Sequence, residues 1–143
     1  MKKEILTYPL SKEQIDKELA FFAQYFIESG HKEFEILFGY AWGNEYYDTN
    51  EWNYETIEIE QLVNKVTSLE AKGFGVLGCD DLFIKIPGQS FDFRFCNDSD
   101  IHISFKESNS IIEDFYNRWK ALGYSPAEWA EGENNKKQRV RIN

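Results

Sequence analysis

The chain of 143 residues carries a formal net charge of −9, and 42% of its residues are hydrophobic and 17% aromatic. This composition is typical of one globular domain with a sizeable core and excludes an intrinsically disordered chain. No apolar run approaches the ~20 residues of a membrane span, and MKKEILTYPL lacks the apolar region of a signal peptide. We therefore expect a single domain over residues 1–143 that lies in the cytoplasm and has no membrane partner.

The charge is distributed unevenly along the chain. No lysine or arginine lies between Lys32 and Lys65, and the acids in that window contribute −8. The rest of the chain holds 17 acids and 16 bases, which is close to balance. Because the acidic window would repel phosphates, we predict no nucleic-acid partner.

Periodic patterns in the first half of the chain predict two helices and two strands. Ser11 and Gln14 form a capping box that begins the first helix, and Gly30 lies just past its end. Alternating or helical spacing of apolar residues predicts the next elements: a strand over 34–42, a short strand over 54–59, and a helix over 62–69 that Gly73 ends. The glycine run at 73–78 follows a helix rather than a strand, so we interpret it as a turn and not as a nucleotide loop.

Three alternating apolar runs between Asp81 and Phe105 predict an antiparallel meander. One face of the meander must be buried, so its register has to align the apolar sets. The simplest register places Phe95 opposite Ile101. On the polar face it places Lys85 opposite Asp92 and Arg94 opposite His102.

A third helix is predicted to begin at a capping box formed by Ser110 and Glu113 and to end at Gly123. Beyond it, residues from about 130 to 143 are expected to form a flexible tail. The elements together predict an α+β domain: an antiparallel sheet of about five strands, with about three helices packed on one face.

The polar face of the meander holds one candidate site, made of Arg94, Cys96, Asp98, Asp100 and His102. In an enzymatic interpretation, Cys96 is a thiolate nucleophile, His102 is its base and an aspartate orients the histidine. The alternative is an ordinary hairpin whose Asn and Asp residues shape the turn. No glycine-rich loop beside Cys96 offers an oxyanion hole, so we predict no catalytic residues.

Five residues offer oxygen and nitrogen ligands for a metal: Asp80, Asp81, Asp98, Asp100 and His102. They lack the regular spacing of a calcium loop, and the two cysteines, Cys79 and Cys96, form no C-x-x-C pair. We therefore predict neither a metal site nor a cofactor, and we expect both cysteines to be reduced thiols.

Residues 40–54, YAWGNEYYDTNEWNY, combine six large aromatic residues with three acids. Tyr and Trp are enriched at binding hot spots, and carboxylates attract basic partners. Tyr40 and Trp42 follow the strand alternation and are expected in the core, and the remaining rings could equally cover the open face of the sheet. We predict that a basic protein partner is contacted by Glu45, Tyr46, Tyr47, Asp48, Glu51, Trp52 and Tyr54.

The run FRFCNDSDIHISF, followed by a helix that ends in WKALGY, is similar in character to bacterial immunity proteins of toxin–immunity systems. The resemblance covers about the last third of the chain and extends to the small size and acidic composition. It implies a non-enzymatic inhibitor whose acidic face blocks the basic active site of a toxin. The alternatives are a small enzyme or ligand-binding domain that uses the polar face of the meander, and a symmetric homodimer closed by exposed aromatic rings.

Overall fold

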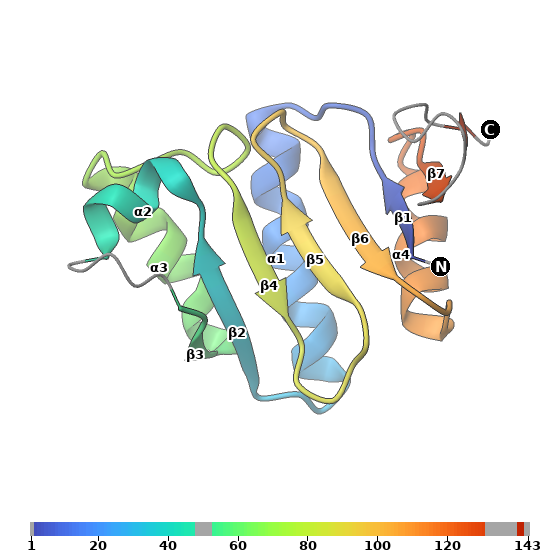
Figure 1. The fold of residues 1–143 in the computed structure, drawn as a ribbon, viewed down its shortest axis with the longest axis horizontal. Helices are drawn as coiled ribbons and strands as arrows, with labels where there is room; N and C mark the ends of the chain where they lie inside the picture. The colour runs from blue at the N-terminus through green and yellow to red at the C-terminus, as the bar shows by residue number, and fades with distance from the viewer. Residues whose placement is uncertain (1, 48–52, 131–139, 142–143) are drawn as a thin grey trace.

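The computed structural model describes residues 2–47, 53–130 and 140–141 (Figure 1). Within these residues the chain forms one eight-stranded antiparallel sheet, with the strand order β3-β2-β4-β5-β6-β1-β7-β8, and four helices. The α+β class is as predicted, whereas the sheet has more strands than the five expected from the sequence.

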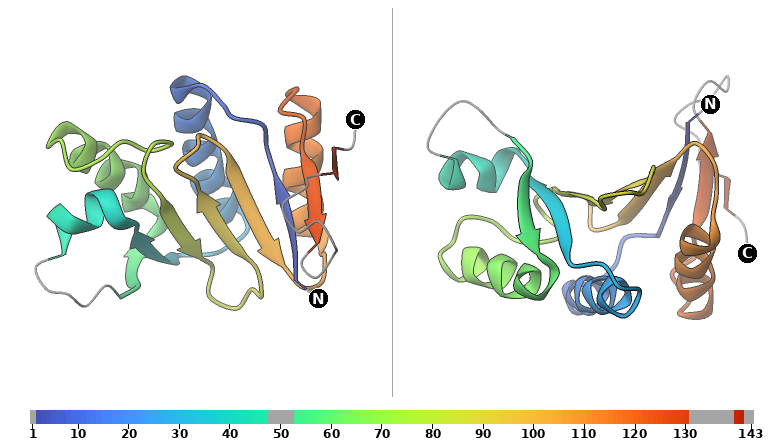
Figure 2. Two further views of the ribbon diagram at one scale, coloured as in Figure 1. Left: turned by 45° about the horizontal axis from the view of Figure 1, so that its top comes forward. Right: turned by 90° about the horizontal axis from the view of Figure 1, so that it is seen from below.

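Three long helices lie in one layer against one face of the sheet (Figure 2). The sheet is curved, with its helix-free face on the inside of the curve. The fourth helix, α2, continues from the end of β2. Along the chain the elements are β1 (Lys3–Leu6), α1 (Lys12–Glu28), β2 (Glu33–Phe38), α2 (Tyr40–Tyr46), β3 (Glu55–Glu58), α3 (Ile59–Ala71), β4 (Leu82–Lys85), β5 (Asp92–Phe95), β6 (Ile101–Phe105), α4 (Ser110–Ala121), β7 (Ala127–Ala130) and β8 (Val140–Arg141).

The meander β4–β5–β6 has the predicted register. Phe95 lies opposite Ile101, and Lys85 lies opposite Asp92. The apolar side chains of the meander face the helices, where Phe93 packs with its ring centroid 4.4 Å from that of Phe22 in α1. The polar residues of the same strands consequently lie on the helix-free face, because side chains alternate along a strand.

The helix starts are partly as predicted. Ser11 and Gln14 form the expected capping box of α1. The capping box expected for α4 is wrong, because Asn109 is the cap and Ser110 is the first helical residue. The side-chain oxygen of Asn109 accepts a hydrogen bond from the Ile112 amide at 3.0 Å, which satisfies a free N–H group of the first turn.

The strand expected over 34–42 is too long, since β2 ends at Phe38 and α2 begins at Tyr40. Glycine is required between them because a Cβ on Gly39 would lie 2.8 Å from the Cβ of Asp81. Trp42 is fully buried as expected, but it reaches the core from a helix. Its indole N–H donates a 2.7 Å hydrogen bond to the carbonyl oxygen of Asp81.

Three strands were not expected from the sequence: β1, β7 and β8. β1 inserts between β6 and β7, with Ile5 opposite Ile103. β8 falls within the tail expected to be flexible and pairs with β7. Residues 131–139 and 142–143 of that tail lie outside the described residues. Across the described part of the chain, no helix combines the length and the apolar character that crossing a membrane requires.

Candidate functional site

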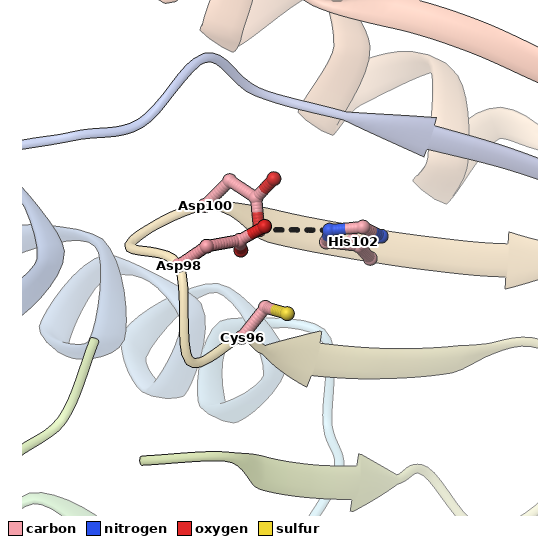
Figure 3. A group of neighbouring side chains, drawn as sticks. All are labelled: Cys96, Asp98, Asp100 and His102. Atoms are coloured by element: carbon pink, nitrogen blue, oxygen red, sulfur yellow. Dashed lines mark hydrogen bonds and ion pairs between the residues drawn. The ribbon is translucent and has the colours of Figure 1, made fainter. Parts of the chain in front are cut away.

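The turn between β5 and β6 brings four polar side chains together (Figure 3). One potential ligand atom from each lies within 4.8 Å of the others, and the four residues are Cys96, Asp98, Asp100 and His102. The backbone closes the turn through a 2.9 Å hydrogen bond from the Cys96 amide to the Asp100 carbonyl. Ser99 adopts a positive φ of 69° inside the turn, a conformation that few non-glycine residues adopt. The backbone conformation of the turn therefore keeps these four side chains close together.

His102 is held between two carboxylates. Its Nε2 lies 2.8 Å from Oδ1 of Asp100, and its Nδ1 lies 2.8 Å from Oε1 of Glu4. Desolvation lowers the pKa of His102, but hydrogen bonds to Asp100, Cys96 and Glu4 outweigh it and raise the pKa to about 11. The ring is therefore an imidazolium at neutral pH, and both of its N–H groups donate.

Glu4 completes this group from β1, 98 residues before His102 in the sequence. Its other carboxylate oxygen accepts a 3.0 Å hydrogen bond from the Ser104 hydroxyl. Burial raises the pKa of Glu4. The hydrogen bond and charge of His102, together with the hydrogen bond from the Ser104 hydroxyl, lower it by more, so the net shift is downward. Arg94 lies beside the same ring, with Nη2 3.3 Å from Nδ1 of His102. Sequence reasoning missed Glu4 because it missed β1.

The acids Asp80 and Asp81, which sequence analysis considered together with this group, serve the neighbouring turns. Oδ2 of Asp80 accepts a 2.8 Å hydrogen bond from the Val76 amide, and Oδ1 of Asp81 accepts one of 2.8 Å from the Asn97 amide. The structure therefore separates these two structural acids from the four converging side chains.

The geometry does not present His102 as a neutral general base for Cys96. A general base needs an unprotonated nitrogen within reach of the proton it accepts. Both nitrogens of His102 already contact carboxylates, and its pKa keeps the ring charged at neutral pH. His102 is therefore held as an imidazolium by Asp100 and Glu4 rather than as a free neutral base.

The contact surface predicted from residues 45–54 is only partly within the described residues. Asp48, Glu51 and Trp52 lie outside them. Glu45 is exposed at the end of α2. The ring of Tyr54 stacks beneath Lys85, whose Nζ is 4.5 Å from the ring centroid. These positions leave the predicted contact surface untested.

Tyr46 and Tyr47 are both tied into the fold. The Tyr46 hydroxyl donates a 2.6 Å hydrogen bond to Oε1 of Glu55, and burial together with this bond raises the pKa of Tyr46. The Tyr47 hydroxyl accepts a 3.0 Å hydrogen bond from the amide of Phe38. β3 pairs only with residues 33–36 of β2, so it does not reach Phe38. Tyr47 therefore provides the partner that this buried amide lacks in the sheet.

Replacing Tyr47 with phenylalanine is expected to lower the free energy of unfolding by about 1–3 kcal/mol, because the buried Phe38 amide loses its acceptor. Urea unfolding followed by circular dichroism measures the change. The matched control is Tyr116→Phe, since the buried Tyr116 hydroxyl has no hydrogen-bond partner among the described residues. A Tyr47→Phe variant as stable as the Tyr116→Phe variant would contradict this role.

A separate group of carboxylates lies where β2 and β3 form the edge of the sheet. Glu33 of β2 stands directly opposite Glu58 of β3, and Glu60 follows in the first turn of α3. All three are exposed, and none takes part in an ion pair within the described residues. We call Glu33, Glu58 and Glu60 the acidic edge. They line a surface hollow of about 500 Å³ together with Ile27, His31, Lys32 and Ile59.

Comparison of the chain with protein-family models, with curated proteins and with solved structures gives no match.

Proposed function

We propose that the protein is a non-enzymatic binding protein, an inhibitor of the immunity type, whose acidic edge engages a basic protein partner such as a toxin. The observation that carries the proposal is the pairing of Glu33 with Glu58 on adjacent strands. Like charges directly opposite each other destabilise a sheet. A cationic side chain from a partner would remove this repulsion when the complex forms.

The surroundings of the pair support a partner that is basic. No lysine or arginine occurs in the sequence from 33 to 64, and the residues that line the hollow include one lysine, Lys32, against three glutamates. The hollow at the acidic edge is large enough to receive a long basic side chain from a partner. Complementary charge of this kind steers association and sets specificity.

A second copy of the chain fits this edge less well than a basic partner. β3 is the outermost strand at this side of the sheet. Pairing of two copies through β3 would bring its two acids, Glu55 and Glu58, close to the same acids in the other copy, which is unfavourable. We place the complex in the cytoplasm, where Cys79 and Cys96, which are free thiols, stay reduced.

The test is affinity capture from a lysate of the organism that encodes the protein. Three baits are compared: wild type, Glu33→Gln with Glu58→Gln, and a control with Glu13→Gln and Glu107→Gln. The control removes the same charge from exposed positions far from the edge. We expect wild type and control to retain one basic protein in stoichiometric amount, and the edge variant to lose it. Wild type that retains no basic protein, or an edge variant that retains it equally well, would refute the proposal.

The edge variant, Glu33→Gln with Glu58→Gln, is expected to gain stability although it loses binding. Neutralising Glu33 and Glu58 removes a like-charge pair, so the free energy of unfolding should rise by about 0.2–1 kcal/mol. Urea unfolding measures the change, and the Glu13, Glu107 control should not show it. An edge variant that is more stable but no longer binds would show that the substitutions remove a contact with the partner and leave the fold intact. Destabilisation of the edge variant would show that these acids serve the fold.

A ligand-binding domain that uses the polar face of the meander is the second candidate function. It is favoured by the convergence of Cys96, Asp98, Asp100 and His102 at one turn. This group lies on the β5–β6 turn, separated from the acidic edge by β4 in the strand order. The two proposals can therefore both hold.

A further inference from the structure

We propose that Cys96, Asp98, Asp100 and His102 bind one zinc ion. The inference rests on the second candidate function, the ligand-binding site on the polar face of the meander, and is independent of the acidic edge, to which none of the four residues belongs.

The first support is the donor set. The four side chains offer one sulfur, one imidazole nitrogen and two carboxylate oxygens. Zinc is bound in proteins by these three ligand types, most often four at a time. Calcium and magnesium prefer sites built from oxygen atoms alone, so a site that includes Cys96 and His102 favours zinc.

The second support is the distance between the donor atoms. All four lie within 4.8 Å of one another. Zinc bonds of about 2.0–2.3 Å in a tetrahedron place ligand atoms roughly 3.5 Å apart. Small side-chain rotations toward a common centre would therefore complete the coordination. Asp98 is exposed and has room to rotate, whereas Asp100 and His102 are 0% and 5% exposed, and their Oδ1 and Nε2 atoms, now 2.8 Å apart, would have to separate slightly.

The third support is the way His102 is oriented. With Nε2 directed toward the three other donors, Nδ1 is held 2.8 Å from Oε1 of Glu4. A histidine that binds a metal almost always donates its other ring N–H to a carboxylate or carbonyl, which fixes the ring. Glu4 is held in turn by the Ser104 hydroxyl at 3.0 Å. Glu4 is thus a positioning residue for the proposed zinc ligand.

The charge of the site is also compatible with a dication. Three acids, Asp98, Asp100 and Glu4, lie at this group against two cationic side chains, His102 and Arg94, so the group carries a net negative charge that attracts a cation.

The test is a calorimetric titration of the full chain with zinc chloride at neutral pH, after chelator treatment and in a non-thiol reductant. We expect one equivalent to bind and the melting temperature to rise with zinc concentration. Cys96→Ser and Asp98→Asn should each weaken binding by at least tenfold, and Glu4→Gln by about 10–100-fold. Asp98 is exposed, so its variant tests the site without disturbing the core.

The matched control is Cys79→Ser, because Cys79 is an exposed free thiol outside the group. It should bind zinc like wild type. Cobalt in place of zinc should give a thiolate-to-metal absorption band that Cys96→Ser abolishes and Cys79→Ser retains. The proposal is overturned if wild type binds no zinc. It is also overturned if Cys96→Ser and Asp98→Asn bind as tightly as wild type, or if Cys79→Ser loses binding.

Discussion

Replacing Arg118 with methionine is expected to lower the free energy of unfolding by about 3–5 kcal/mol. Arg118 of α4 makes two hydrogen bonds to Glu18 of α1, from Nε at 3.2 Å and from Nη2 at 2.7 Å. The Glu18 side chain is only 2% exposed, so the substitution leaves a buried carboxylate without its counterion. The guanidinium also stacks on Phe21, 3.6 Å from the ring centroid, and this contact is lost as well.

Urea unfolding measures the effect, and two further variants identify its cause. Glu18→Leu combined with Arg118→Met should recover most of the lost stability, because both charges leave the interior together. Lys17→Met breaks an exposed pair with Glu13 and should change stability by less than about 1 kcal/mol. An Arg118→Met variant that loses no more than the Lys17→Met variant would contradict the role of the buried pair.

Replacing His102 with glutamine is expected to cost the zinc-free protein about 3–5 kcal/mol, because Asp100 is fully buried and loses its cationic partner. Asp100→Asn added to this variant should restore part of the stability, since it removes the uncompensated carboxylate. Equal stability of wild type and His102→Gln in a chelator would contradict the role of the imidazolium.

The same histidine gives the stability of the wild-type protein a pH dependence. The pKa of His102 is about 11 in the folded state, against an ordinary value of 6.5. Its contribution is therefore complete below pH 6.5 and is lost as the pH rises toward 11. The lowered pKa of Glu4 acts in the opposite direction, and its contribution is lost as the pH falls below its ordinary value of 4.5. Unfolding in chelator should show the alkaline loss in wild type and not in His102→Gln.

The parts of the fold that sequence reasoning predicted well are local. The capping box of α1 needs only Ser11 and Gln14, and the register of the meander needs only alternation across short turns. β1 and β7 could not be found this way, because their pairing joins segments far apart in the chain. α2 was missed because Tyr40 and Trp42 continue the alternation of β2, so the spacing of the aromatic residues fits a strand equally well.

The candidate site, like the fold, was predicted from the sequence only where it depends on local pairing. Sequence alternation placed Arg94 opposite His102, and the short turn brought Cys96, Asp98 and Asp100 near them. Glu4 could not be predicted without β1. The sequence showed the acidic window, but it could not show that Glu33 and Glu58 stand opposite each other, because that depends on the pairing of β2 with β3.

The most direct measurement of the proposed function is the activity of the captured basic partner as purified protein is titrated into it. An inhibitor that acts by occupying the partner's surface should abolish that activity at one molecule per molecule, and Glu33→Gln with Glu58→Gln should shift the titration to much higher concentration. A partner whose activity persists in excess protein would contradict the inhibitor. Inactivation of the partner by less than one equivalent of the protein, through chemical modification of the partner, would also contradict it, because the protein would then act as an enzyme.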